Sequence, residues 1–324
     1  MKKILVTGAS GFIGSHLTEF LCKLGYDVRA FVHYNSSGSW GWLDSTPIKK
    51  DIEIVRGDIR DFDSVSNAVK GVDTVYHLAA LIGIPYSYES PLAYVKTNIE
   101  GSYNVLESVK RHGVGRVMMT STSEVYGTAK YTPIDELHPL QPQSPYSASK
   151  ISADQIALSY FNSFNTPVVI ARPFNTYGPR QSARAIIPAI AVQLLNGRKN
   201  IELGSVTPKR DVTFVKDTVA AMHTIANEDS FIGSAVNIGS GTEYSIRDFF
   251  EKLCSITGTK AEISQSEERL RPQKSEVHRL LCNNQKIISS TNWKTNYSIE
   301  QGLAETVEWL KTHLHLYKAD IFNV

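Results

Sequence analysis

The chain has 324 residues, with 34 Lys and Arg against 32 Asp and Glu, which gives a formal net charge of +2. At about 150 residues per domain, this length predicts about two domains, or one large α/β unit with an appendage. The near-neutral charge argues against a protein that coats nucleic acid or anionic membrane, and the 42% hydrophobic content excludes wholesale disorder.

Other features narrow the class further. No apolar run approaches the ~18 residues that span a bilayer, and Gly8 interrupts the first apolar run too early for a signal peptide. The three cysteines, Cys22, Cys254 and Cys282, are widely spaced and indicate packing positions, not a disulfide framework or a metal site. We therefore expect a cytoplasmic protein with no metal.

Short apolar segments alternate with longer amphipathic ones through the first half of the chain. Strands are predicted over 3–7, 28–32, 52–55, 74–78, 116–120 and 167–171, and helices over 12–24, 61–70, 91–111 and 147–164. This alternation predicts an α/β fold, a Rossmann-type doubly wound parallel sheet covered by helices on both faces.

The rhythm becomes irregular after about residue 175. Helices are predicted near 185–196, 217–227, 246–257 and 300–314. We expect a dinucleotide-binding domain over 1–174, with strands returning to it from about 210–240. A smaller, interleaved C-terminal substrate domain would comprise 175–209 and 241–324.

The first chemical motif lies between the first strand and helix, where glycines stand at 8, 11 and 14. Glycine permits a sharp turn close to a pyrophosphate, and the following helix offers free amides to the phosphates. A tight turn without a ligand is the alternative. We expect a nicotinamide dinucleotide to bind at Gly8, Ser10, Gly11, Phe12, Ile13 and Gly14.

The end of the second strand bears on the choice between NADP and NAD. An acid there would bind the adenosine 2′-hydroxyl and repel a 2′-phosphate, but this chain has His33, Asn35 and Ser36 instead. NADP is therefore slightly favoured over NAD, unless these residues only begin a loop that carries two exposed-looking tryptophans.

Two later strand ends add candidate cofactor contacts: Asp58 and Ile59 after the third strand, and Leu78, Ala79 and Ala80 after the fourth. An acid at a strand end can accept a hydrogen bond from adenine, and small alanines leave room for a ribose. Turn chemistry and packing are the alternatives for each, and His77 is expected to be a core histidine.

Tyr146 and Lys150 form a possible proton-transfer pair, because residues spaced i, i+4 share one helix face. The ammonium would lower the phenol pKa, so that a tyrosinate could take a proton from a sugar hydroxyl. Both residues could also contact the cofactor.

A strand-end segment about two dozen residues earlier carries Thr122, Ser123 and Glu124. Thr122 can donate to the hydroxyl that is oxidised. Simple hydroxyl oxidation needs no further acid, so Glu124 indicates proton chemistry at a neighbouring carbon. A surface residue or helix cap is the alternative for Glu124.

Together these motifs identify a resemblance. The chain resembles, along nearly its whole length, the extended short-chain dehydrogenases/reductases that act on nucleotide-diphosphate sugars. The resemblance rests on TGASGFIG (7–14), GDIRD (57–61), HLAA (77–80), STSEVYG (121–127), YSASK (146–150), RPFNTYGPR (172–180), RDVTFVKD (210–217) and Arg271-Pro272.

Within that group, the resemblance implies a 4,6-dehydratase. Most 4-epimerases lack an acid at the Glu124 position, whereas 4,6-dehydratases and some decarboxylases carry it. The segments NSSGSWGWL and NTYGPRQSARAIIP look most like the UDP- or GDP-N-acetylglucosamine 4,6-dehydratases of legionaminic-acid-type pathways. Substrate binding would fall to Asn175, Arg180, Arg184, Arg210 and Arg271, and the family commonly forms homodimers through two helices per subunit.

The expected reaction is therefore the conversion of a nucleotide-diphosphate hexose into its 4-keto-6-deoxy form, through transient oxidation at C4, with a recycled cofactor. A UDP-uronate decarboxylase, a dehydratase that stops at the 5,6-ene and a 4-epimerase remain alternatives. A nucleotide sensor without chemistry is disfavoured, because a sensor need not keep Thr122, Glu124, Tyr146 and Lys150.

Overall fold

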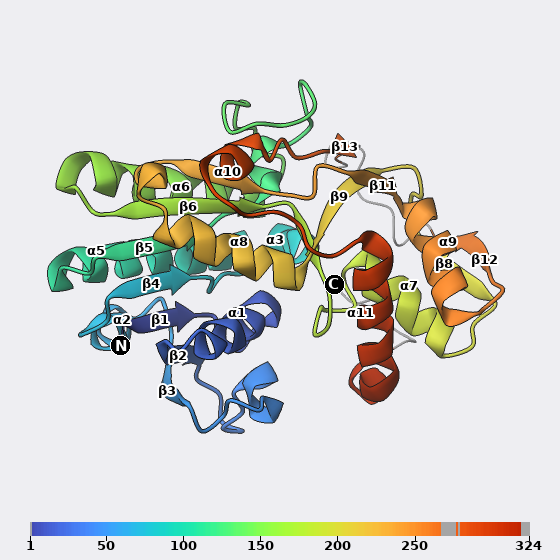
Figure 1. Ribbon diagram of the computed structural model, residues 1–324, viewed down its shortest axis with the longest axis horizontal. Helices are drawn as coiled ribbons and strands as arrows, with labels where there is room; N and C mark the ends of the chain where they lie inside the picture. Colours follow the sequence, from blue (N-terminus) through green and yellow to red (C-terminus); the bar gives the residue numbers. More distant parts are fainter. Residues whose placement is uncertain (1, 267–276, 278, 319–324) are drawn as a thin grey trace.

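The computed structural model describes residues 2–266, 277 and 279–318, which form a large parallel sheet and a smaller region beside it (Figure 1). The sheet has seven strands in the order β10-β6-β5-β4-β1-β2-β3, and every neighbouring pair is parallel. The predicted doubly wound α/β fold is confirmed.

The strands are short and rich in Val and Ile, which suit a sheet buried on both faces. They are β1 (Lys3–Thr7), β2 (Asp27–His33), β3 (Ile52–Gly57), β4 (Thr74–His77), β5 (Arg116–Thr120), β6 (Val168–Pro173) and β10 (Ala235–Ile238).

Helices cover the sheet on two sides. Helices α2 (Phe62–Val69), α5 (Gly101–His112) and α6 (Pro145–Phe164) pack on one face, and α1 (Phe12–Lys23) and α8 (Val215–Asn227) pack on the other. The apolar side chains of each face form a separate cluster, with Leu5 in one and Val6 in the other, because successive strand residues point to opposite faces.

The region predicted as one helix over 91–111 is divided. It comprises α4 (Pro91–Tyr94), a π-helical stretch (Val95–Glu100) and α5. Short elements that no periodicity predicted include α3 (Ile84–Glu89), a 3₁₀ turn η1 (Gly41–Ser45) and a second 3₁₀ turn η3 (Ser123–Tyr126). Turns this short carry too few residues to show a helical period.

The smaller region contains helices α7 (Ile186–Leu195), α9 (Ile246–Thr257) and α11 (Ile299–His313), with α10 (Gln285–Ser290) returning to the edge strand β10. Its strand β9 (Lys209–Phe214) pairs with three short strands, β7 (Asn175–Tyr177), β11 (Glu243–Ser245) and β13 (Arg279–Leu280). Strands β8 (Asn200–Leu203) and β12 (Glu262–Gln265) form a separate pair. Of the strands expected to return from 210–240, β10 therefore joins the large sheet and β9 does not.

The register of the large sheet brings the strand ends to one edge. Thr7 pairs with His77, His77 with Met119, and Thr120 with Ala171. The chain order reverses between β1 and β4, which is where sheets of this type leave a crevice at the carboxyl ends of the strands.

Candidate active site

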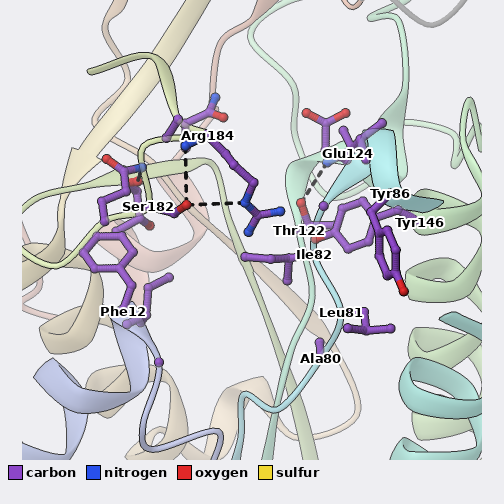
Figure 2. A pocket seen from close by; sticks show the side chains of 18 of the residues that line it. Phe12, Ala80, Leu81, Ile82, Tyr86, Thr122, Glu124, Tyr146, Ser182 and Arg184 are labelled. Atoms are coloured by element: carbon purple, nitrogen blue, oxygen red, sulfur yellow. Dashed lines mark hydrogen bonds between the residues drawn. The ribbon is translucent and has the colours of Figure 1, made fainter. Parts of the chain in front are cut away.

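A cavity of about 1570 Å³ opens at this edge, between the carboxyl ends of the strands and the smaller region. Its lining draws on the glycine-rich turn after β1, the ends of β4 and β5, helix α6 and the segment after β7. Figure 2 shows the part in which Thr122, Glu124 and Tyr146 lie on one side and Arg184 reaches toward them from the other.

The glycine-rich turn leaves no room for a side chain at two of its three glycines, Gly8 and Gly14. Gly8 has a positive φ of 69°, and a Cβ there would lie 2.8 Å from the backbone nitrogen of Ala79. A Cβ at Gly14 would overlap the carbonyl oxygen of Gly8. Helix α1 begins after Gly11 with no side-chain cap, so its first amides face the cavity uncapped. These features fit the pyrophosphate of a dinucleotide.

At the end of β2, only part of the expected set faces the cavity. The exposed His33 lines it, whereas Asn35 and Ser36 are not among the lining residues. The Asn35 amide instead donates to the Ser39 carbonyl at 2.8 Å, and its oxygen accepts from Ser37 at 2.6 Å. Asn35 is used to shape its own loop.

Asp58 and Ile59, after β3, both line the cavity. The Asp58 carboxylate accepts two hydrogen bonds at 3.0 Å from the Nε of Arg60, and this bonding holds the pKa of Asp58 below its usual range. The carboxylate is therefore ionised and able to accept from a ligand amine.

After β4, Leu78, Ala79 and Ala80 line the cavity, and His77 lies behind them. The His77 ring is buried between the hydroxyls of Thr7 at 2.8 Å and Ser102 at 3.2 Å. Burial lowers its pKa to about 3. His77 is thus a neutral core residue, as predicted.

Four of the five predicted catalytic residues come as two pairs: Thr122 and Glu124 from the turn after β5, and Tyr146 and Lys150 from helix α6. The turn η3 follows β5 and carries Glu124, whose backbone N–H donates to the Thr122 hydroxyl at 3.2 Å (Figure 2). Helix α6 carries Tyr146 and Lys150 and begins with a capping box at Ser144. Ser123 also lines the cavity, so all five predicted catalytic residues do.

The electrostatics of Tyr146 and Lys150 differ in part from expectation. Burial raises the pKa of Tyr146, opposed by a hydrogen bond with Thr122, and the neighbouring Glu124 raises it further. Burial also lowers the pKa of Lys150, opposed by Asp154. The Lys150 ammonium donates to the Thr120 carbonyl at 2.6 Å, which leaves two of its three N–H donors for other groups. Without a further positive charge, the buried phenol is neutral at neutral pH.

The residues predicted to bind substrate lie in different settings. Asn175, Arg180, Arg184 and Arg210 all line the cavity, whereas Arg271 lies outside the described residues. Arg180 donates to Glu19 at 2.7 Å and to Ser15 at 3.1 Å, both on α1. The more exposed Arg184 donates to the hydroxyl of its near neighbour Ser182 through its backbone N–H and its Nε, each at 3.4 Å, and its side chain reaches into the cavity (Figure 2). Arg180 therefore joins the two regions, and Arg184 faces the cavity.

Sequence reasoning missed a group of lining residues beside the catalytic cluster. Tyr86 and Tyr88 from α3, together with Ile82 and Ser182, belong to this group. The available signal was the segment Ile82–Tyr88, two tyrosines and apolar residues directly after a strand that already carried candidate cofactor contacts. Such side chains suit the apolar faces and hydroxyls of a sugar ring.

The arrangement can therefore hold a dinucleotide along the edge of the sheet and a second ligand in the part of the cavity next to Arg184. Where the two meet, a phenol, an ammonium, a hydroxyl and a half-buried carboxylate share one cavity. This set can move protons at two adjacent carbons of one substrate.

Comparison with known proteins agrees with this geometry. Residues 5–306 match the model of the family described as GDP-mannose 4,6 dehydratase. A dTDP-glucose 4,6-dehydratase of Streptomyces antibioticus is 31% identical over 312 residues, which cover 95% of this chain and 92% of the relative.

Solved structures include both dehydratases and epimerases among the neighbours. The dTDP-glucose 4,6-dehydratase DesIV of Streptomyces venezuelae, crystallised with NAD, has a TM-score of 0.88 and 28% identity, covering 98% of this chain and 99% of its own. The epimerase Mth375 of Methanothermobacter thermautotrophicus has a TM-score of 0.89 and 30% identity, covering 97% and 94%. Overall similarity therefore does not separate these two activities, and the site residues must.

Proposed function

The chain belongs to the GDP-mannose 4,6 dehydratase family of extended short-chain dehydrogenases/reductases, and from this premise we propose that it converts a nucleotide-diphosphate hexose into its 4-keto-6-deoxy form. The observation that supports dehydration over simple C4 chemistry is the Glu124 carboxylate, which lines the same cavity as Tyr146 and Lys150. The net change is the loss of one water from the sugar.

A bound oxidised nicotinamide would supply the hydride acceptor for C4, return the hydride at C6, and favour ionisation of Tyr146 by its positive charge. Tyr146 then accepts the proton of the C4 hydroxyl, with Thr122 as its hydrogen-bond partner. Lys150 offers the ammonium that stabilises the tyrosinate and binds ribose hydroxyls.

Glu124 performs the second proton transfer. A ketone at C4 acidifies the hydrogen on C5, and the Glu124 carboxylate removes it. The C6 hydroxyl leaves as water after it receives a proton from Glu124 or Ser123, both of which line the cavity. When the hydride returns to C6, C5 takes up one proton from solvent and Tyr146 releases to solvent the proton it took from the C4 hydroxyl, so the net loss is one water. Each positioned acid or base of this kind contributes about 10²–10⁴-fold to the rate.

For the substrate, we keep UDP- or GDP-N-acetylglucosamine as the proposal, on the resemblance of residues 35–43 and 175–188. The relatives named above support dTDP-glucose as the competitor. For the cofactor, the lack of an acid between His33 and Leu43 supports NADP, and the NAD bound to DesIV supports NAD.

We also propose a homodimer, formed through α5 and α6. These helices contact each other, and each carries a large exposed aromatic side chain, Tyr103 and Phe164. Light scattering on the purified protein tests this assembly.

The reaction is tested by incubating the protein with UDP- and GDP-N-acetylglucosamine, dTDP-glucose and UDP-glucuronate, each read by mass spectrometry. Loss of water without net cofactor reduction is expected with one of the hexoses. Loss of carbon dioxide from UDP-glucuronate would instead establish the decarboxylase. Proton NMR of the products separates the isomers of equal mass. An inverted C4 without a change in mass would establish the epimerase, and water loss with a retained C5–C6 double bond would establish the 5,6-ene enzyme.

Glu124→Gln separates the two proton transfers. It removes the base but keeps the size of the side chain, so we expect dehydration to fall by about 10²–10⁴-fold. Cofactor binding and thermal stability should stay near wild type, because Glu124 is half-buried and its hydrogen bonds to Thr122 and Gly127 use its backbone atoms. Near-wild-type dehydration by this variant would remove Glu124 from the mechanism.

A further inference from the structure

A buried ion pair lies directly behind the catalytic cluster. Asp154 and Arg172 have side chains that are 2% and 4% exposed, and their charged atoms are 3.1 Å apart. Neither residue lines the cavity. The mechanism above uses neither of them.

The carboxylate of this pair is tied to both catalytic elements. Asp154 follows Lys150 by one turn of α6, so the two share a helix face. Its Oδ2 accepts from the Ser121 hydroxyl at 2.8 Å and from the Arg172 Nε at 3.1 Å. Ser121 directly precedes Thr122.

The guanidinium extends the network to the other end of the same segment. Arg172 donates to the Tyr126 hydroxyl at 3.1 Å, and that hydroxyl donates to the Asn237 side-chain oxygen at 2.7 Å. Tyr126 is fully buried, and the Arg172 guanidinium also lies 5.3 Å from the centre of its ring. Tyr126 stands two residues after Glu124.

We propose that the Asp154–Arg172 pair is a positioning device that sets Glu124 and Thr122 against Tyr146 and Lys150. It anchors residues 121–126 at both ends: Ser121 on the side of Thr122, and Tyr126 on the side of Glu124. The anchoring carboxylate comes from α6, the helix that carries the other two catalytic residues. Asp154, Arg172, Tyr126 and Ser121 are positioning residues, and the proposal rests on the proposed dehydratase function for its readout.

Geometry explains why such a network is needed. The turn η3 is a single 3₁₀ turn of four residues, which has little stiffness of its own. A displacement of about 1 Å at a reacting group can cost about 100-fold in rate. A buried ion pair contributes little net stability over apolar side chains, so its directional hydrogen bonds are the property that apolar packing could not replace.

The two anchors predict separable effects. Tyr126→Phe removes one hydroxyl on the Glu124 side, and we expect proton removal at C5 to slow by about tenfold, a part of the full contribution of a positioned base. Oxidation at C4 should stay close to the wild-type rate. In single turnovers, C4 oxidation is followed by the absorbance of the reduced nicotinamide, and C5 proton removal by deuterium uptake from heavy water, read by mass spectrometry.

Tyr160→Phe is the matched control. Tyr160 lies on α6, is buried, and donates its hydroxyl to the Glu107 carboxylate at 2.9 Å, away from the cavity. Like Tyr126→Phe, this variant loses a buried hydroxyl that donates to a side-chain oxygen, so it reports the general cost of removing such a group. Cofactor occupancy and melting temperature are measured for both variants.

Ser121→Ala tests the opposite end and should slow C4 oxidation more than C5 proton removal, while Asp154→Asn should slow both. If Tyr126→Phe slows the two steps equally, or behaves as Tyr160→Phe does, the positioning role is wrong. The wild-type product alone decides the proposed function. If the wild type releases no water, that function fails. The positioning role is then decided by C4 oxidation alone, which should be slower in Asp154→Asn than in Tyr160→Phe if the pair positions the site.

Discussion

His33 is the residue on which the cofactor preference can be tested most directly. It stands exposed at the end of β2 and lines the cavity, while Asn35 is held by its own loop. An acid at this position would accept from a ribose 2′-hydroxyl and repel a 2′-phosphate. The side chain at residue 33 should therefore control the ratio of NADP to NAD affinity.

We expect His33→Asp to weaken NADP binding relative to NAD by about tenfold, equivalent to about 1.4 kcal/mol. Titration of cofactor-free protein with each dinucleotide, followed by calorimetry, gives the two dissociation constants. His33→Asn, which adds no charge, is the control. An unchanged ratio in His33→Asp would show that residue 33 does not face the 2′ position.

Arg180 shows how the role of a single residue depends on its partners. The motif and the resemblance suggested a substrate ligand, but its guanidinium is paired with Glu19 on α1. It also has an unusual positive φ of 72°, which is held by this surrounding structure. Glu19 and Ser15 take two of its five N–H donors, so only the remaining donors can reach a substrate.

At the scale of elements, the unit formed by β1, the glycine-rich turn and α1 has the least room for change. The carbonyl of Gly8 lies where a Cβ of Gly14 would be, so the helix cannot approach the strand unless residue 14 lacks a side chain. The same close approach leaves the first amides of α1 facing the cavity.

Gly14→Ala should therefore lower the free energy of unfolding by about 1–3 kcal/mol and weaken dinucleotide binding, because the turn must open to admit the methyl group. Gly115→Ala is the matched control, since a Cβ there meets only the Asp73 carbonyl at 3.5 Å. Urea unfolding and cofactor titration measure both effects. If the two variants behave alike, the clash at Gly14 is relieved without cost.

Helix α6 and turn η3 illustrate what an element contributes beyond its own residues. Periodicity predicted a helix over 147–164, and the observed bounds are Pro145–Phe164, with the capping box at Ser144 setting its start. The one-turn η3 was not predicted, yet it carries Glu124. Its last residue, Tyr126, is bonded to Arg172, which pairs with Asp154, and both of these partners are distant from η3 in sequence.

At the scale of the whole molecule, the two regions are joined by specific contacts around the cavity. Arg180 pairs with Glu19, the His16 ring contacts the Pro179 carbonyl at 3.0 Å, and Trp42 packs edge-on against Trp309 at 5.4 Å. Trp42 is half-buried, not exposed as its loop suggested. No described helix is long and apolar enough to cross a membrane.

The pH dependence of folding is a property of the whole chain to which His77 contributes. Its pKa is about 3 in the folded protein against an ordinary value of 6.5, so the unfolded chain binds the proton first as the pH falls. The contribution of neutral His77 to the free energy of unfolding is therefore complete above pH 6.5 and is lost as the pH falls toward 3. One such group changes the free energy of unfolding by about 1.4 kcal/mol per pH unit within that window.

His77→Gln should reduce the slope of the free energy of unfolding against pH by the equivalent of about one proton between pH 6 and pH 4. The same substitution should lower the free energy of unfolding at neutral pH by about 1–3 kcal/mol, because hydrogen bonds of His77 are lost. Urea unfolding at several pH values measures the slope. The exposed His112→Gln is the control and should leave it unchanged. An equal slope in His77→Gln and wild type would mean that His77 is not neutral in the folded protein.

The sequence by itself determined the fold class and named five catalytic candidates that the fold brings into one cavity. Strand and helix periods are local properties, and the glycine turn and the Tyr146–Lys150 pair each lie within one short segment. For this reason β5 and α9 were predicted at their observed bounds, and the five catalytic candidates all line one cavity.

Only the tertiary structure decided how distant residues divide their roles. Nothing local to Arg180 indicates Glu19 as its partner, nothing in residues 32–36 indicates that Asn35 bonds back to its loop, and nothing near Asp154 indicates Arg172, Ser121 and Tyr126. The physical reason is that the role of a charged or polar side chain depends on which hydrogen-bond or ion-pair partners lie next to it in the folded protein. Those partners are brought to it by the packing of the whole chain, at separations that no local pattern encodes.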